Sequence, residues 1–274
     1  MTFTDPASTE FLVRPEGRVA YDVAGSGPLV VLAPGLGDLR ATYRFVAPAM
    51  RDAGYRVACT DLRGHGDSDG SFSSYGDAET ASDIAALIEA LGGPAIIVGN
   101  SMAAASAVLI AAQRPELVAG VALIGPFVRD PNSNPFGRLM LRAAMARPWV
   151  AASWRAYMPK LYAGRRPDDF DDHRNHVIAS LGRPGHAMAL SLTARTSHAG
   201  AEANLSRVSI PTLVVMGEMD PDFPDPKAEA DWVAAAVHGE AVMVPDAGHY
   251  PQSQQPEVTT RALIAFADRV AAHA

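Results

Sequence analysis

The feature that most constrains the fold is the segment around Ser101, where a β-forming apolar run is followed at once by an alanine-rich helical run. The apolar run is 96–98, and the residues two positions before and after the serine are Gly99 and Ala103. A serine in a sharp strand-to-helix turn needs small neighbours there, because the backbone is crowded. The pattern therefore predicts a nucleophilic serine whose Oγ projects from the turn. A serine that merely caps an ordinary helix gives the same pattern. Other segments of the chain are therefore needed to distinguish a nucleophilic serine from a helix cap.

Short β-like runs alternate with helical runs along the chain, which predicts an α/β fold with a mostly parallel central sheet flanked by helices. One helix ends near Leu91, and a terminal helix contains Leu263 and Phe266, with apolar residues at helical spacing in both. A further helix is expected at 43–53. The expected strands are 28–33, 56–61, 95–98, 118–124, 212–216 and 240–244.

One long segment departs from this alternation. Residues 127–206 have a helical pattern without a convincing strand, and prolines interrupt them at positions 148, 159, 167 and 184. We expect a helical cap at 127–206, inserted into a core domain made of residues 1–126 and 207–274.

Composition narrows the class of protein. The chain has 274 residues, 48% of them apolar, which suits one α/β domain with an insertion. The net charge of -7 argues against nucleic acid or an anionic membrane as a partner. No apolar stretch approaches the ~20 residues that a membrane-spanning helix needs, and the start of the chain lacks the pattern of a secretory leader. The single cysteine, Cys59, cannot form an internal disulfide. We expect a cytoplasmic protein, a monomer or a homodimer.

Two loops supply the groups that a serine nucleophile requires. A serine hydroxyl needs a base within hydrogen-bond reach, and the base needs a group that holds its tautomer. The loop 217–224 follows the expected strand 212–216 and carries Asp220, and the loop 245–251 follows the strand 240–244 and carries His249. Loops at the carboxyl ends of parallel strands share one edge of a sheet. We therefore expect Ser101, Asp220 and His249 to meet there.

A fourth element follows the expected strand 28–33. Its glycines let the backbone point an N–H inward, so that the N–H groups of Leu36 and Met102 would hold a developing oxyanion, each donor being worth ~2.7–4 kcal/mol. A dinucleotide-binding loop is the alternative. It is disfavoured because Gly35 and Gly37 are not followed by the third glycine of that fingerprint.

Taken together, these segments resemble the α/β-hydrolase superfamily over nearly the whole chain. The matching motifs, in order, are 34–37, 61–68, 99–103, 217–220 and 248–249. The resemblance implies Ser101 as nucleophile, His249 as general base and then acid, and Asp220 as its orienting carboxylate. It implies the backbone N–H groups of Leu36 and Met102 as oxyanion donors, and no cofactor. The chain departs from the family pattern at two positions: Pro34 stands where members usually have histidine, and Ala103 where they usually have glycine.

Other residues offer competing assignments. Asp130, after the expected strand 118–124, is an alternative acid because some hydrolases take it from that loop, and Glu218 is a second alternative. His65 is expected to belong to a structural turn beneath the site. His173 and His176 share a helical face but lack a third strong ligand, so we expect a solvated surface there and no metal site.

The expected cap is rich in aromatic residues and methionines, most of which would form its core while a few line the substrate pocket. The candidate pocket residues are Gly35, Phe127, Met145, Trp149, Trp154, Met158 and Tyr250.

We expect a carboxylic ester hydrolase, acting on a small-molecule ester, lactone or thioester through an acyl-enzyme. Haloalkane dehalogenases and epoxide hydrolases of the superfamily use aspartate at the position of Ser101, which argues against both. The segment 99–102 also resembles the elbow of the ring-cleavage-product hydrolases, which cut carbon–carbon bonds and bind a substrate carboxylate through a cap arginine. The available arginines are Arg129, Arg138, Arg142 and Arg155. A cofactor-free perhydrolase activity and a ligand receptor with little turnover are the remaining alternatives.

Overall fold

A computed structural model describes residues 8–130 and 135–272. Its centre is an eight-stranded sheet of order β1-β2-β4-β3-β5-β6-β7-β8. The strands from β3 onward run parallel to one another, whereas β2 pairs antiparallel with both β1 and β4. The mostly parallel α/β sheet predicted from the sequence is therefore confirmed. The strand bounds are β1 Glu10–Arg14, β2 Gly17–Ala24, β3 Leu29–Ala33, β4 Arg56–Thr60, β5 Ala95–Asn100, β6 Val118–Ile124, β7 Thr212–Gly217 and β8 Glu240–Val244.

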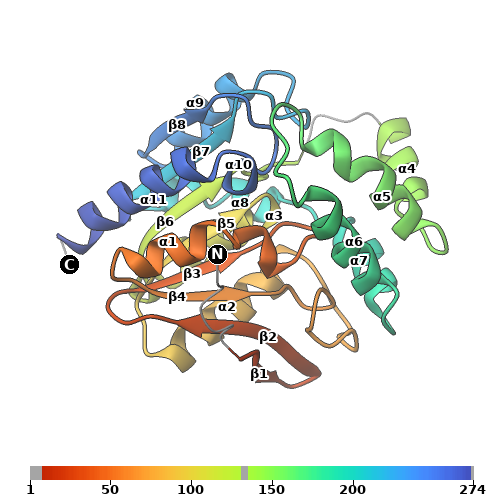
Figure 1. Cartoon of the computed structure of the whole chain (residues 1–274), viewed down its shortest axis with the longest axis horizontal. Helices are drawn as coiled ribbons and strands as arrows, with labels where there is room; N and C mark the ends of the chain where they lie inside the picture. The colour runs from red at the N-terminus through yellow and green to blue at the C-terminus, as the bar shows by residue number, and fades with distance from the viewer. Residues whose placement is uncertain (1–7, 131–134, 273–274) are drawn as a thin grey trace.

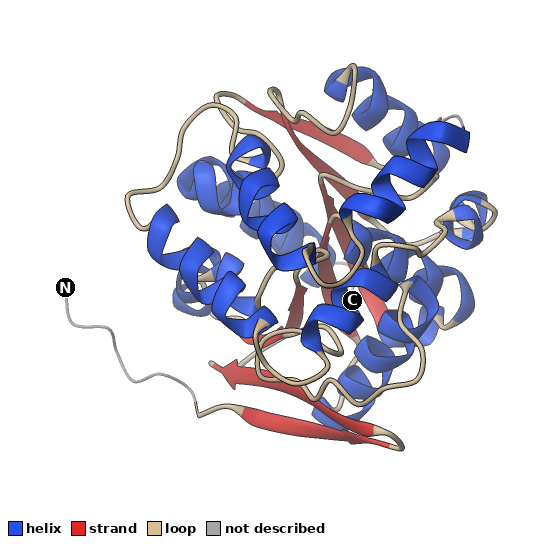
Figure 2. Cartoon of the chain, turned by 90° about the vertical axis from the view of Figure 1, so that its right-hand side faces the viewer, coloured by secondary structure: helices blue, strands red, loops and turns tan. Residues whose placement is uncertain are grey.

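Helices cover both faces of the sheet (Figures 1 and 2). Alternation along the strands divides the core, so that Val31 of β3 packs toward one face and Val30 and Leu32 toward the other. One face carries α2 Asp77–Leu91, α3 Met102–Gln113 and α9 Pro226–Ala236, and the other carries α1 Val46–Asp52 and α11 Pro256–Ala271. The helix expected at 43–53 begins only at Val46, because a 3-10 turn, η1 Arg40–Tyr43, precedes it.

In the described residues, five α-helices and the short 3-10 helix η3 Leu205–Arg207 stand between β6 and β7. The five α-helices are α4 Pro135–Ala144, α5 Val150–Leu161, α6 Phe170–Leu181, α7 His186–Thr193 and α8 Ala199–Glu202. We call them the inserted helices. The helices α4 to α7 lie at one end of the sheet (Figure 1), whereas α8 packs against α3 on one face of the sheet. The helices α5, α6 and α7 share a hydrophobic cluster with Tyr250 and with the partly buried Leu36 and Leu39 of the core.

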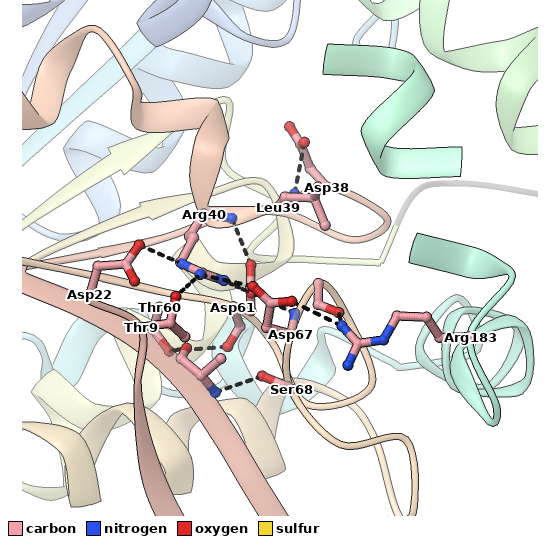
Figure 3. A network of polar contacts seen from close by, with 12 residues as sticks. Thr9, Asp22, Asp38, Leu39, Arg40, Thr60, Asp61, Asp67, Ser68 and Arg183 are labelled. Atoms are coloured by element: carbon pink, nitrogen blue, oxygen red, sulfur yellow. Dashed lines mark hydrogen bonds and ion pairs between the residues drawn. The ribbon is translucent and has the colours of Figure 1, made fainter. Parts of the chain in front are cut away.

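Ion pairs also join the inserted helices to the core. Two nitrogens of the Arg44 guanidinium donate to the carboxylate of Asp169: Nε to Oδ2 at 2.6 Å and Nη2 to Oδ1 at 2.5 Å. Arg183, between α6 and α7, pairs with Asp67 at 3.0 Å, and Asp67 in turn accepts from Arg40 at 2.9 Å (Figure 3). The segment 61–68, one of the motifs of the sequence, therefore contacts the connection between α6 and α7. None of the helices in the described residues is long and apolar enough to cross a membrane.

Candidate active site

The turn between β5 and α3 holds Ser101 in a backbone conformation of positive φ, with φ 57° and ψ -121°. This conformation is unusual for a residue with a side chain, and it persists only where the surroundings fix it. Here the N–H of Ser101 donates to the carbonyl of Ile124 at 2.8 Å. A Cβ atom on Gly99 would lie 2.4 Å from the carbonyl oxygen of Ala103, so glycine at position 99 is a steric requirement. The sharp turn predicted from the sequence is present.

The loop after β3 lies directly against this turn. A Cβ atom on Gly35 would come within 2.7 Å of Cβ and 3.3 Å of Oγ of Ser101. The next residue, Leu36, and the first helical residue, Met102, both carry backbone N–H groups that donate no hydrogen bond within the described part of the chain. Two free donors beside a serine hydroxyl are what an oxyanion site needs.

His249 and Asp220 form a buried pair at the ends of β8 and β7. Nδ1 of His249 lies 2.7 Å from Oδ2 of Asp220, and each of the two residues is 2% exposed. The backbone of His249 is also fixed: its N–H donates to Leu161 of α5 at 2.8 Å, and its carbonyl accepts from the side chain of Asn100 at 3.3 Å. The histidine is thus tied both to the turn that carries Ser101 and to an inserted helix.

The environment of His249 strengthens it as a base. Burial by itself would lower the pKa of His249, but the adjacent Asp220 carboxylate outweighs burial and raises that pKa to about 9. Asp222 contributes in the same direction, with Oδ2 at 3.8 Å from Nδ1. In the described residues His249 bonds to Asp220, and no hydrogen bond joins the ring to Oγ of Ser101. Such contacts commonly shorten only when substrate is bound.

The competing acids and bases lie elsewhere. Asp130 accepts from Oγ of Ser197 and from the N–H of His198, both at 2.7 Å, and Glu218 is exposed. It is therefore Asp220, and neither of these carboxylates, that the structure brings to His249.

The remaining candidate histidines have their own surroundings. Nδ1 of His65 lies 3.0 Å from the carbonyl of Arg63, and burial lowers the pKa of His65 to about 4. His173 is buried and pairs with Asp38 at 2.7 Å, a contact between α6 and the loop after β3, whereas His176 is exposed. The two histidines that share a helical spacing therefore point into different environments.

Most of the candidate pocket residues are either close to His249 or buried in the inserted helices, and Trp149 is the exception. The rings of Phe127 and Tyr250 lie 5.7 and 5.2 Å from that of His249, and Trp154 and Met158 are buried in the inserted helices. Met145 is buried in the same cluster. Trp149 is 51% exposed and its Nε1 donates to the carbonyl of Ala143, so the structure does not bring it to the site.

Ser101 and the His249 pair lie beneath the inserted helices. Ser101 is 9% exposed and His249 is 2% exposed. A cavity of about 810 Å³ between α6 and the core is lined by Arg40, Asp67 and Arg183 rather than by these residues. The side chains of Ser101 and His249 are therefore largely shielded from solvent.

Sequence reasoning missed two side chains beside the site. Tyr157 of α5 donates from its hydroxyl to Oδ1 of Asp222, which connects an inserted helix to the loop that carries Asp220. Asn100, next to the serine, donates to the carbonyls of Ile124 and His249. The only sign of these contacts in the sequence was the polar character of Asn100, directly before the serine. The partners of both side chains are distant along the chain, so no local pattern marks the contacts.

Comparison with known proteins agrees with the fold of the chain. A protein-family model described as "Alpha/beta hydrolase family" matches residues 30–262. The 2-(acetamidomethylene)succinate hydrolase of Mesorhizobium japonicum is 28% identical over 96% of this chain and 98% of its own length. Among solved structures, an esterase from Thermogutta terrifontis with bound malate is 24% identical, with a TM-score of 0.76 over 96% of this chain and 99% of that one. Est816, described as an N-acyl homoserine lactone degrading enzyme, is 22% identical, with a TM-score of 0.79 over 94% of this chain and 100% of that one. The family model spans most of the sequence, and the chain belongs to the alpha/beta hydrolase family.

Proposed function

We propose that this hydrolase cleaves a carboxylic ester through an acyl-enzyme, with Ser101 as nucleophile, His249 as general base and Asp220 as the carboxylate that orients it. The observation that carries the proposal is the buried pair of Asp220 and His249, 2.7 Å apart, beside a serine held at positive φ in a sharp turn. A base with an oriented tautomer and an adjacent hydroxyl is the arrangement that serine acyl transfer uses.

The chemistry follows from the positions of these groups. Asp220 holds the Nδ1 proton of His249, which leaves Nε2 to accept the proton of Ser101 as Oγ attacks the substrate carbonyl. The negative charge that develops on the carbonyl oxygen is received by the N–H groups of Leu36 and Met102. His249 then returns the proton to the leaving alcohol, and a water molecule, deprotonated by the same histidine, cleaves the acyl-enzyme.

The surroundings of the site favour an apolar acyl group. The rings of Phe127 and Tyr250 flank His249, and Trp154 and Met158 lie in the helices above it. Small or medium uncharged esters and lactones are the substrates that such walls accommodate. An esterase and a lactone-degrading enzyme share the fold, which supports starting with these two classes.

Carbon–carbon bond hydrolysis receives less support. That reaction class would require an arginine able to hold a substrate carboxylate, but Arg129 pairs with Glu229 and Arg155 contacts Asn175. Arg142 is exposed, and the side chain of Arg138 lies outside the described residues. Ester hydrolysis makes no such demand.

Steady-state hydrolysis of p-nitrophenyl esters from acetate to palmitate tests the proposal, with Ser101→Ala prepared identically as the control. We expect multiple turnovers with the native chain, a preference for short or medium acyl chains, and no turnover with the variant. Absence of turnover on every ester and on a lactone series would contradict ester hydrolysis. A single cycle that stops after acylation would instead favour a receptor.

A further inference from the structure

His249 faces a second carboxylate besides Asp220. Oδ2 of Asp222 lies 3.8 Å from Nδ1, and its side chain is 14% exposed, whereas that of Asp220 is fully buried. The N–H of Asp222 also donates to Oδ1 of Asp220 at 3.1 Å. Asp222 thus acts on the pair in two ways: its backbone orients Asp220, and its side-chain charge faces the imidazole ring.

An inserted helix holds Asp222 in this position. The hydroxyl of Tyr157, on α5, donates to Oδ1 of Asp222, so that Oδ2 is the oxygen turned toward His249. The ring of Tyr157 lies 6.0 Å from that of Trp154, whose Nε1 donates to the carbonyl of Gly37 at 2.8 Å. Two side chains of one helix therefore contact the loops after β7 and β3, on either side of Ser101.

We propose that Asp222 is a positioning residue for His249, and that the contact of Tyr157 with Asp222 makes the basicity of His249 depend on the position of α5. The inference rests on the proposed role of His249 as the general base. When α5 lies against the sheet, Asp222 is fixed and stabilises the protonated imidazole. When α5 moves away, Asp222 loses its donor, turns into solvent and acts on His249 less strongly.

The charged groups that face His249 determine how each substitution changes its pKa. Asp220 and Asp222 approach from the loop after β7, and Asp38 from the loop after β3 contributes at longer range. Phe127 and Tyr250 present uncharged rings. An opposite charge within a few ångströms shifts a pKa by about 1 unit or more, so removing the charge of Asp222 lowers the pKa of His249.

Substitution of Asp222 should therefore leave two marks on the pH profile. Asp222→Asn moves the acid limb of kcat/KM to lower pH by about 1 unit, since His249 loses its proton earlier. The same variant lowers the rate on the alkaline plateau, because the imidazolium that forms in the transition state is less stabilised. Tyr157→Phe, which keeps the ring and removes only the hydroxyl, produces a smaller change in the same direction.

Asp225→Asn is the matched control. It makes the same chemical change three positions along the loop, where the carboxylate accepts from the N–H of Ala228 and caps α9. Asparagine caps a helix as well as aspartate does, so this variant should fold normally and leave the acid limb in place.

A direct titration separates this inference from the proposed function. The imidazole ¹⁵N shifts of His249, assigned by their absence in His249→Gln, are followed against pH in the Ser101→Ala background, in which no turnover is needed. We expect the His249 pKa to fall in Asp222→Asn, to fall less in Tyr157→Phe, and to stay unchanged in Asp225→Asn. An unchanged pKa in the first two variants, or an equal fall in all three, overturns the inference. If the pKa falls as expected but the native chain turns over no ester, the coupling of Tyr157 to His249 stands and ester hydrolysis fails.

Discussion

At the scale of single residues, substitution of Asp220 is the most direct test of the site, because it shows whether this carboxylate orients His249. Asp220→Asn keeps the size of the side chain but no longer enforces the tautomer in which Nε2 accepts a proton. We expect the variant to fold and bind substrate, and to lose about 10⁴-fold in kcat. Ester hydrolysis at saturating substrate measures the loss.

Glu218→Gln supplies the control for this prediction, since Glu218 is exposed in the same loop. It should keep native activity. Were Asp220→Asn to retain full turnover, the orienting role would pass to another carboxylate, and Asp130 or Glu218 would have to move toward His249.

The sequence was sufficient to nominate Ser101, Asp220 and His249 because each follows an expected strand of the parallel sheet, and parallel strands deliver their carboxyl ends to one edge. It was not sufficient for Tyr157 and Asp222. Their contact joins positions 65 residues apart. No local pattern marks an exposed tyrosine on a helix as the partner of a loop carboxylate, because that pairing exists only once the helices have packed.

At the scale of elements, the parallel strands were predictable, and the two antiparallel strands at the start of the chain, β1 and β2, were not. β3, β5 and β7 are buried along their whole length, which leaves nearly continuous apolar runs in the sequence. β1 is largely exposed and mixes charged with apolar residues, and β2 pairs antiparallel, so neither shows the pattern of a buried strand. The helix α9 was likewise not anticipated after the proline-rich loop.

The attachment of α5 to the core can be tested with two tryptophans. Trp154 is 6% exposed and donates to Gly37, whereas Trp149 is 51% exposed and donates within the inserted helices. We expect Trp154→Phe to lower the free energy of unfolding by about 1–3 kcal/mol, because the Gly37 carbonyl loses a buried partner. Trp149→Phe should change it by less than about 0.5 kcal/mol. Urea denaturation of the three proteins measures both effects, and equal losses would show that Trp154 does not anchor α5.

At the scale of the whole molecule, burial of the His249 pair couples folding to pH. The pKa of His249 is raised to about 9 in the folded chain, against about 6.5 when unfolded. Below pH 6.5 both states bind the proton, and the stabilisation from the pair is fully present. Between the two values only the folded state binds it, so stability falls as pH rises, by about 1.4 kcal/mol per pH unit from this group. Above pH 9 the contribution is lost.

Urea denaturation at intervals from pH 6 to pH 10 would reveal this dependence, with His249→Gln as the reference. We expect the native chain to lose stability across the window between the two pKa values, and the variant to give a flatter curve there, because glutamine does not titrate. Parallel curves for the two proteins would mean that His249 binds its proton no more tightly in the folded chain than in the unfolded one. The acid limb expected for ester hydrolysis would then have to arise from another group. A divergence confined to this window would assign the pH dependence of folding there to His249, the same group that is expected to set the acid limb of ester hydrolysis.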